Sequence, residues 1–252
     1  MSAVVQLFEW FGELGRFCQR LARTALTPPY EGREFIRQLS EVGANSLLLV
    51  SLAGAATGVV LSLETRDALL RFGAKPLLPT VIVISLLKES GPIITGLMVS
   101  GRVGASIGAE LAAMQVTEQV DAISASGIDP FKYLVATRVL ACVLMLPLLT
   151  LAADFCGVLM GFVTNTLTEP VSWHLFIKSG FSSVTFSDFL APTLKTAVFG
   201  LIIGLVACFE GLRARGGTAG VERAAANSVV FASIFIILAD VLLVRLILVL
   251  FP

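Results

Sequence analysis

Residues 76–101 read PLLPTVIVISLLKESGPIITGLMVSG, and this apolar run sets the fold class of the chain. It exceeds the ~20 residues that an α-helix needs to cross the hydrocarbon core of a bilayer. Lipid offers the backbone no hydrogen-bond partner, so each amide must be satisfied within its own segment and a helix is expected. Lys88 and Glu89 lie in the middle of this helix, where a charge costs at least ~2.5 kcal/mol. The pair therefore needs a specific reason to be there.

Four further apolar segments are long enough, or nearly so, to be spanning helices. They cover residues 43–63, 139–163, 191–208 and 227–251, of which 191–208 is the shortest. Only 14% of the 252 residues are charged and the mean hydropathy is +0.89, which is far outside the range of soluble domains. The sequence also lacks the alternating pattern of a membrane β-barrel. These features predict an all-α integral membrane bundle of five transmembrane helices.

Residues 3–23 have the pattern of an amphipathic helix rather than of a span. Apolar side chains repeat at steps of three and four residues, and charged side chains repeat on the opposite face. Trp10 and Phe17 flank the apolar stripe, which fits a helix lying in the membrane interface. A helix that packs against a partner protein is the alternative. We assign residues 1–40 to an N-terminal interfacial helix and connector, and residues 41–252 to the membrane domain.

Charge and cysteine usage exclude several classes of protein. Eighteen lysines and arginines balance eighteen aspartates and glutamates, so the chain lacks the basic face that nucleic acid requires. The four cysteines are scattered without a CxxC motif and His174 is the single histidine, so neither a disulfide framework nor a metal site is expected. No GxSxG motif, histidine pair or dense aspartate cluster indicates an intramembrane enzyme. We therefore expect no catalytic residue, no cofactor and no metal in this chain.

The distribution of basic residues predicts the orientation in the membrane. The loops on the side of the N-terminus contain eleven lysines and arginines, whereas the loops on the other side contain four. Under the positive-inside rule, the N-terminus and the loops at 102–138 and 209–226 are cytoplasmic. The C-terminus then lies on the opposite side of the membrane.

Pairs of glycines spaced four residues apart occur in or beside the apolar segments. Such a pair clears one stripe of a helix, so that a second backbone can approach closely where lipid supplies no hydrophobic drive. The pairs favour a tightly packed bundle or dimer. They are Gly54/Gly58, Gly104/Gly108, Gly157/Gly161 and Gly200/Gly204.

The charged interruption KESGP, residues 88–92, has two interpretations. In the first, a salt-bridged kink only shapes the bundle, because Pro92 deprives the helix of one internal hydrogen bond. In the second, the charged pair faces a cavity and meets a polar ligand, with Lys88 contacting an anionic headgroup. Adjacent residues point about 100° apart on a helix, so we expect Lys88 and Glu89 to have different partners.

Residues 100–138 form a polar, amphipathic stretch between two predicted spans. A short helix there is well placed to contact a soluble partner, and a solvated loop without a partner is the alternative. Asp129-Pro130 is a helix start signal, with Asp129 as N-cap and Pro130 at the first helical position. The chain is therefore predicted to break near Gly127 and to re-enter the membrane in the next helix.

Four motifs follow one another along the chain: KESGP at 88–92, GRVGASIGAELAAMQVTEQVDAI at 101–123, GIDP at 127–130 and ARGGTAGVERAAANSVV at 214–230. Together they resemble the MlaE family of ABC transporter permeases over nearly the whole chain. The resemblance implies a homodimeric permease of the bacterial cell inner membrane, with its C-terminus in the periplasm. It also implies two kinds of partner, a separate ABC ATPase on the cytoplasmic face and a periplasmic MCE-domain hexamer. Such complexes move phospholipids between the inner and outer membranes and so maintain outer-membrane lipid asymmetry.

The resemblance also suggests which residues bind the lipid. It makes Lys88 and Glu89 candidates for the phospholipid-binding cavity. Many relatives have arginine at the position of Lys88; arginine binds phosphate through two parallel hydrogen bonds, whereas lysine acts as a point charge. Further residues implied to line the cavity precede this pair in the chain: Leu61, Leu69 and Phe72.

A second set of residues is implied to connect the permease to its ATPase. Glu118, Gln119 and Asp121 fall in the part of the motif that resembles the cytoplasmic coupling helix, near residues 115–127. We refer to residues 115–127 as the coupling segment. ATP hydrolysis is expected in the partner chain, and closure of the ATPase would reach the permease through this segment.

An ion- or proton-coupled secondary transporter is the main alternative, with Lys88, Glu89 and Asp240 as a relay. It predicts flux driven by pH without an ATPase. Broken helices that recur in both halves of the chain would support this alternative. The sequence has only one interruption of this kind, at KESGP. Asp240 and Arg245 lie five residues apart in the last apolar segment, and the sequence leaves open whether they form a structural or a functional pair.

Overall fold

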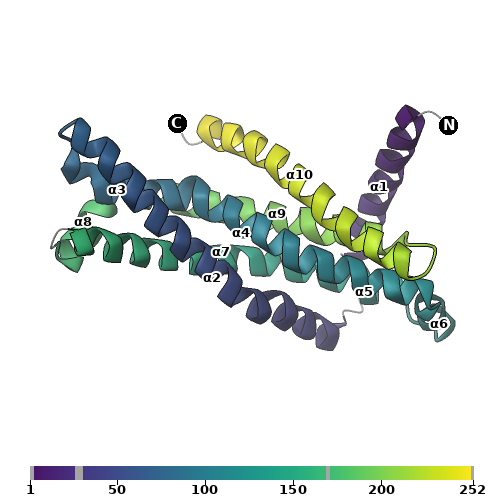
Figure 1. Cartoon of the computed structure of the whole chain (residues 1–252). Coiled ribbons are helices and arrows are strands. Elements are labelled where there is room, and N and C mark those ends of the chain that lie inside the picture. Colours follow the sequence, from purple (N-terminus) through teal and green to yellow (C-terminus); the bar gives the residue numbers. More distant parts are fainter. Residues whose placement is uncertain (1–2, 26–30, 169–170, 251–252) are drawn as a thin grey trace. The chain divides into compact units, whose positions relative to one another are not determined.

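The computed structural model describes residues 3–25, 31–168 and 171–250, and over these ranges it contains helices and no strand. The predicted all-α fold is confirmed (Figure 1). In chain order the helices are α1 (Ala3–Ala25), α2 (Gly32–Arg71), η1 (Lys75–Leu77), α3 (Leu78–Ser85), η2 (Leu86–Ser90), α4 (Gly91–Val99), η3 (Ser100–Gly104), α5 (Ala105–Val116), α6 (Gln119–Ala125), η4 (Phe131–Ala136), α7 (Thr137–Thr168), α8 (Trp173–Gly180), α9 (Phe186–Leu212) and α10 (Thr218–Leu250).

Five helical stretches of the described chain are long and apolar enough to cross a membrane, as predicted. Each is longer than the apolar core expected from the sequence, because backbone hydrogen bonding continues into the flanking polar turns. The short segment 191–208, for example, lies within the 27-residue helix α9. The five stretches are Gly32–Arg71, Lys75–Val116, Phe131–Leu167, Phe186–Leu212 and Thr218–Ile247.

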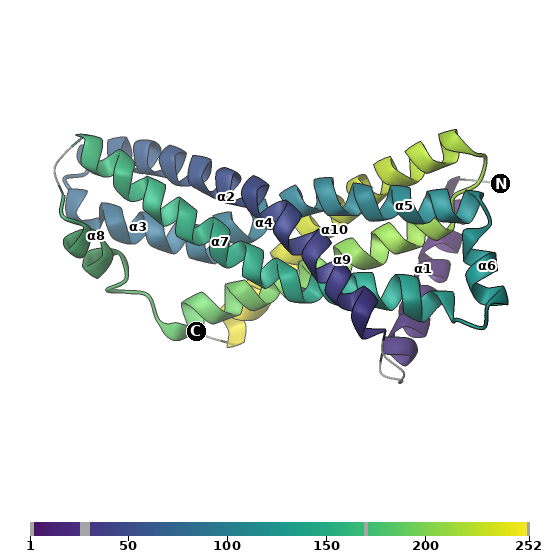
Figure 2. The ribbon, with the colours of Figure 1, turned by 90° about the horizontal axis from the view of Figure 1, so that it is seen from below.

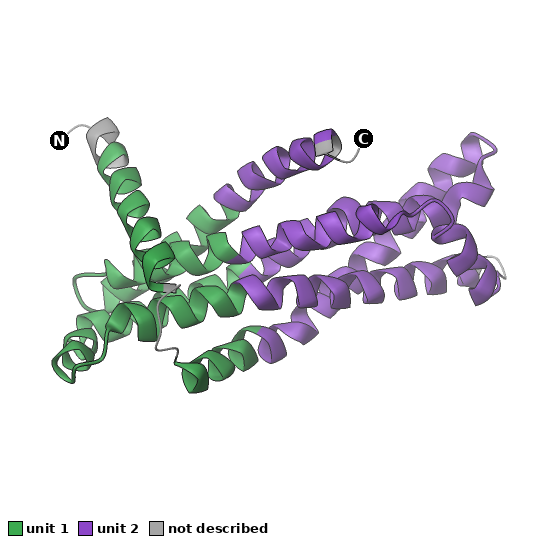
Figure 3. Ribbon diagram, turned by 180° about the vertical axis from the view of Figure 1, so that it is seen from behind, with its two compact units in different colours: residues 1–42, 100–142, 201–233 green, residues 43–99, 143–200, 234–252 purple. Residues whose placement is uncertain are grey.

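The chain divides into two compact units, and each of the five long stretches contributes residues to both (Figure 3). Unit 1 contains α1, α5, α6 and the start of the third long stretch. Unit 2 contains the KESGP motif. By residue number, unit 1 is 1–42, 100–142 and 201–233, and unit 2 is 43–99, 143–200 and 234–252.

In unit 2, α2 and α7 pack through two of the predicted glycine pairs. A Cβ atom at Gly58 would collide with the backbone carbonyl group of Gly157. A Cβ atom at Gly157 would in turn lie 3.0 Å from the carbonyl oxygen of Gly54. One turn further along, Ser62 Oγ donates a hydrogen bond to the Gly161 carbonyl oxygen at 3.2 Å. Two backbones approach this closely only where both helices lack side chains.

Helix α8 was not predicted from the sequence, in which residues 164–190 were assigned to a loop. It lies beside α3 in unit 2 (Figure 2). Ser172 Oγ caps it by accepting a hydrogen bond from the Leu175 N–H group at 3.3 Å, and Phe176 is fully buried against α3. Thr80 Oγ1 joins the two helices by donating to the Ser179 carbonyl oxygen at 2.7 Å.

In unit 1, the predicted amphipathic N-terminal helix is present as α1, and its aromatic face packs on the chain's own helices. Trp10 Nε1 donates to Glu210 Oε1 at 2.8 Å, and its ring meets the Phe209 ring edge to face at 5.4 Å between centroids. The Phe17 ring lies 4.9 Å, between centroids, from the ring of Phe131 at the start of the third span. The aromatic stripe of α1 therefore has an intramolecular partner.

The predicted helix start at Asp129 is confirmed in unit 1. Asp129 Oδ1 accepts a hydrogen bond from the Phe131 N–H group at 3.0 Å, and the Asp129 carbonyl oxygen accepts one from the Tyr133 N–H group at 3.1 Å. Just before it, Gly127 has φ of +80°, a left-handed conformation that glycine adopts without steric cost. The chain breaks at this glycine and starts the next long helix at the aspartate.

Candidate functional site

The π-helical segment η2 presents Lys88 and Glu89 in unit 2. Such segments often occur at functional sites in helical proteins. Pro92 follows the segment, and because proline has no N–H group it cannot bond the carbonyl group of Lys88 four residues earlier. That carbonyl oxygen accepts a hydrogen bond from Lys195 Nζ at 3.0 Å. The proline of the motif thus leaves a backbone acceptor free for a cation on another helix.

Lys195, on α9, is the centre of a charged network formed with Lys88, Glu89, Asp188 and Asp240. Its side chain is only 2% exposed, and Nζ lies 3.0 Å from Glu89 Oε2 and 2.9 Å from Asp240 Oδ1. The Lys88 carbonyl oxygen and Glu89 Oε2 accept hydrogen bonds from Nζ, whereas Asp240 Oδ1 forms an ion pair with it without a hydrogen bond. Buried charges are tolerated when they are paired in this way. The network therefore joins η2, α9 and α10 within unit 2.

Lys88 has a different partner from Glu89, as expected. Its Nζ lies 2.7 Å from Asp188 Oδ1 in the first turn of α9. Thr185 fixes this carboxylate, because its N–H and hydroxyl groups both donate to Asp188 Oδ2, at 3.1 and 2.7 Å. The side chains of Lys88 and Asp188 are 43% and 26% exposed, so this half of the charged network is open to a ligand.

A pocket of about 70 Å³ adjoins the charged network. Its walls combine four of the charged residues with the apolar side chains of α10, which suits an amphipathic ligand. Its volume is far below the ~300–1,000 Å³ of typical ligand sites. The pocket of a single chain therefore has no room for a whole lipid molecule. The lining residues are Lys88, Glu89, Ser187, Asp188, Pro192, Lys195, Val244 and Ile247.

The sequence did not single out Lys195 or Asp188. Lys195 lies inside the apolar segment 191–208, so the argument that identified Lys88 as costly applies to it equally. Asp188 falls in a predicted loop, where a carboxylate gives no signal. Asp240 pairs with Lys195, whereas Arg245 is exposed on α10.

The structure does not bring the other predicted cavity residues to the charged network within this chain. Leu61 and Leu69 of α2 pack against the buried cluster formed by α3, η2 and α8. Phe72 is 84% exposed. None of the three is among the described residues that line the pocket beside Lys88.

The coupling segment lies in unit 1 and contains the short helix α6 after α5. None of the residues of α6 is buried, and Glu118, Gln119 and Asp121 are exposed. Glu118 has φ of +59°, a left-handed conformation that costs a non-glycine residue roughly 1–2 kcal/mol. Strain of this kind is common at functional sites. The segment has the exposure and the sharp turn that a docking element needs.

A groove of about 890 Å³ runs beside the coupling segment in unit 1. Glu118 and Asp121 line it together with Glu13 of α1 and Arg213, which follows α9. Arg213 is paired with Glu13 at 2.9 Å, so the carboxylates of the coupling segment remain available. Arg215 also lines the groove, so its walls carry both acidic and basic side chains.

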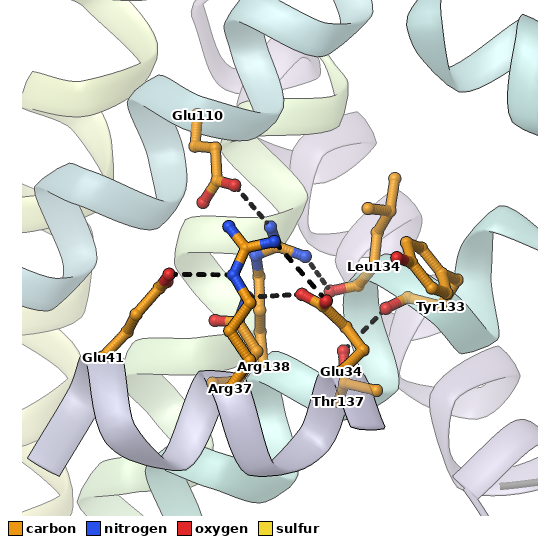
Figure 4. Close-up of polar contacts among 9 residues, drawn as sticks. Glu34, Arg37, Glu41, Glu110, Tyr133, Leu134, Thr137 and Arg138 are labelled. Carbon is orange, nitrogen blue, oxygen red and sulfur yellow. Dashed lines mark hydrogen bonds and ion pairs between the residues drawn. The ribbon is translucent and has the colours of Figure 1, made fainter. Parts of the chain in front are cut away.

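A polar cluster in unit 1 contains the buried Arg138, Glu110 of α5 and charged residues of α2 (Figure 4). Arg138 is 1% exposed and donates to Glu110 Oε1 at 2.8 Å. On α2, Arg37 lies between Glu34 and Glu41, at 3.6 and 3.1 Å from their carboxylate oxygens. Glu110 belongs to α5 and Arg138 to α7, the helices on either side of the coupling segment. Their ion pair therefore ties together two helices that flank the segment.

Comparisons with a family model and with individual proteins both identify this chain as similar to permeases. The family model described as Permease MlaE matches residues 35–246. A probable ABC transporter permease protein of Rickettsia felis is 37% identical over 235 residues, which cover 93% of this chain and 91% of that protein. Proteins with the same description in Synechocystis and Porphyra purpurea are 32% and 31% identical. Their matches cover 82% and 89% of this chain, and 79% and 87% of the respective relatives.

Proposed function

Because the chain belongs to the MlaE permease family, we propose that it moves phospholipids as the membrane-spanning subunit of an ABC transporter. The chain is a multi-pass membrane permease subunit, with five apolar helices. The observation that carries the phospholipid proposal is the charged network formed by residues of three candidate membrane spans. Charges within a span mark substrate pathways, because a purely structural helix avoids their cost.

The chemistry of the charged network fits a phospholipid headgroup. Lys88 is partly exposed and can meet a phosphate once its ion pair with Asp188 opens, while Lys195 holds Glu89 in place behind it. The apolar side chains of Val244 and Ile247 suit acyl chains. Since the pocket of one chain holds only about 70 Å³, we propose that a homodimer encloses the full cavity. Leu61, Leu69 and Phe72 are proposed to line that dimeric cavity.

The coupling segment supports an ABC ATPase as the cytoplasmic partner. We propose that Glu118, Gln119 and Asp121 dock on this ATPase, and that rigid-body closure of the ATPase is transmitted through α6. We propose a cytoplasmic N-terminus and a periplasmic C-terminus in a bacterial inner membrane, and the excess of basic residues in the loops on the N-terminal side supports this orientation. A periplasmic MCE-domain hexamer would then receive or deliver the lipid. In this proposal residues 1–40 form the interfacial helix and connector, and residues 41–252 form the permease domain.

The proposal is tested by the lipid that copurifies with the complex. Glu89→Lys places a second cation beside Lys195 and breaks the ion pair, so we expect at least a fivefold loss of bound phospholipid by mass spectrometry. Glu64→Lys makes the same charge change at an exposed position of α2 and is the matched control. If Glu89→Lys retains as much phospholipid as the wild type, the charged network is not the lipid site.

A proton-coupled secondary transporter is the alternative, and the observation that favours it is the chain of ionisable groups that leads from the half-exposed Glu89 through the buried Lys195 to Asp240. The two functions differ in their energy source. Proteoliposomes that contain the permease alone would show flux driven by a pH gradient under the alternative. Under our proposal, flux requires the ATPase subunit and ATP.

A further inference from the structure

Asp154 is a buried carboxyl group in unit 2 that takes no part in the charged network. It lies on α7 within the third long stretch, and the residue is 4% exposed. Its Oδ1 has no hydrogen-bond partner among the residues that the structure describes. A carboxyl oxygen that is buried without a partner inside a span is costly and therefore marks a candidate functional position. The sequence did not single it out, although it lies within the apolar segment 139–163.

The Asp154 carboxyl group fits against the backbone of Gly91, directly after η2. A Cβ atom at residue 91 would collide with Asp154 Oδ1, and it would lie 3.0 Å from the Leu86 carbonyl oxygen. We call the space left by the missing side chain the Gly91 notch. The N–H group of Gly91 closes the π-helical segment by donating to the Leu86 carbonyl oxygen. The notch therefore lies at the end of the segment that carries Lys88 and Glu89.

We propose that Asp154 is a positioning residue for Lys88 and Glu89, a role that rests on the proposed lipid function. By filling the Gly91 notch, its carboxyl group fixes the register of η2 against α7. A shift of the π-helical turn by one residue would rotate the side chains within it by roughly 100° and separate Lys88 from Asp188. The role requires the shape of the carboxyl group rather than its charge, because Oδ1 meets no hydrogen-bond donor.

Two substitutions of Asp154 separate shape from charge. In the full permease complex, Asp154→Ala empties the notch, and we expect at least a fivefold loss of copurified phospholipid by mass spectrometry. Asp154→Asn keeps the planar shape without the charge, and should stay within twofold of the wild type. Thr150→Ala is the control, since Thr150 is buried one turn earlier on α7 and its hydroxyl group donates to its own helix.

A double substitution tests the notch itself. Gly91→Ala places a methyl group where the carboxyl group lies, so it should lose phospholipid as Asp154→Ala does. Combining Gly91→Ala with Asp154→Ala removes the collision, and the methyl group then fills the notch from the other side. We expect the double variant to regain at least half of the wild-type phospholipid. Non-additivity of this kind is the signature of direct contact.

Alignment of the charged network can be measured without lipid. Cysteines introduced at Lys88 and Asp188 should be joined by a short bifunctional thiol reagent in the wild-type and Asp154→Asn backgrounds. The cross-linked fraction should fall at least fivefold with Asp154→Ala. Unchanged cross-linking with Asp154→Ala, equal losses with Asp154→Asn and Asp154→Ala, or a double variant no better than Gly91→Ala would each overturn the inference. A wild-type complex without phospholipid, but with the expected cross-linking pattern, would overturn the proposed function alone.

Discussion

Lys195 is a cation that the membrane tolerates because η2 supplies two hydrogen-bond acceptors and α10 supplies a second carboxylate. The Lys88 carbonyl oxygen, Glu89 Oε2 and Asp240 Oδ1 all lie within 3.0 Å of its Nζ atom. Removing one partner of a buried ion pair is far more damaging than replacing the whole pair, because the remaining charge is left uncompensated. The residue therefore acts as a structural centre for the candidate lipid site.

Replacing Lys195 tests this view at the scale of one side chain. We expect Lys195→Met to destabilise the permease by about 3–5 kcal/mol, since Asp240 and Glu89 lose their shared cation. Adding Asp240→Asn should recover much of that loss, because the buried carboxylate is then neutral. Thermal unfolding of the purified protein measures both effects. Lys178→Met, at an exposed position of α8, is the control, and an equal loss there would contradict the assignment.

At the scale of single elements, α6 is distinctive because it combines exposure with a strained first residue. Glu118 adopts φ of +59° just before α6, and the Arg138–Glu110 pair ties α5 to α7 around the coupling segment. A rigidly anchored, exposed helix of this kind can pass on a push from a partner. The backbone strain and the side-chain charge at residue 118 can be tested separately.

Two substitutions at Glu118 separate the effect of backbone strain from the effect of side-chain charge. Glu118→Gly relieves the left-handed strain, worth roughly 1–2 kcal/mol, so the fold should be at least as stable as the wild type. Both Glu118→Gly and Glu118→Lys remove the carboxylate, and we expect both, like Asp121→Lys, to uncouple ATP hydrolysis from lipid transport. ATPase and transport assays on the reconstituted complex measure the coupling. Glu222→Lys, at an exposed position of α10, is the control. Normal coupling in all three variants would show that the coupling assignment is wrong.

At the scale of the whole molecule, glycines let long helices approach closely, beside clusters of large buried apolar side chains. Lipid provides no hydrophobic drive between spans, so stability depends on close backbone contact. In unit 2 the contact runs along α2 and α7, where Gly58 faces the Gly157 carbonyl group. Large apolar side chains such as Leu48 and Leu52 of α2 stay exposed, as expected for a surface that meets lipid or a second copy.

Gly58→Ala tests this packing. The added methyl group has no room against α7, so we expect a loss of about 1–3 kcal/mol of stability, typical of overpacking. Gly101→Ala is the matched control, because Gly101 also lies in a span but has no neighbour within 4 Å of the added atom. Thermal unfolding of the two variants in detergent should differ accordingly. Equal midpoints would contradict the close packing of α2 on α7.

The fold class and several local features followed from the sequence because each depends on neighbouring residues alone. Span length follows from apolar runs, the helix start follows from Asp129, and close packing follows from glycine spacing. The Lys88–Glu89 interruption was likewise visible as charge inside an apolar run. Helix α8 was missed, because residues 164–190 are short and polar enough to resemble a loop, although Phe176 anchors a helix there.

The partners of these charges were decided only by the packing of the helices. Lys195 lies 107 residues from Lys88 along the chain, and Asp154 reaches Gly91 only because α7 passes beside the end of η2. The surroundings of Leu61, Leu69 and Phe72 could not be predicted either, because the neighbouring sequence does not indicate what these side chains face. Hydropathy dictates that a segment crosses the membrane but carries no information on which spans are neighbours. The side-chain constellation at the charged network is therefore a property of the tertiary structure.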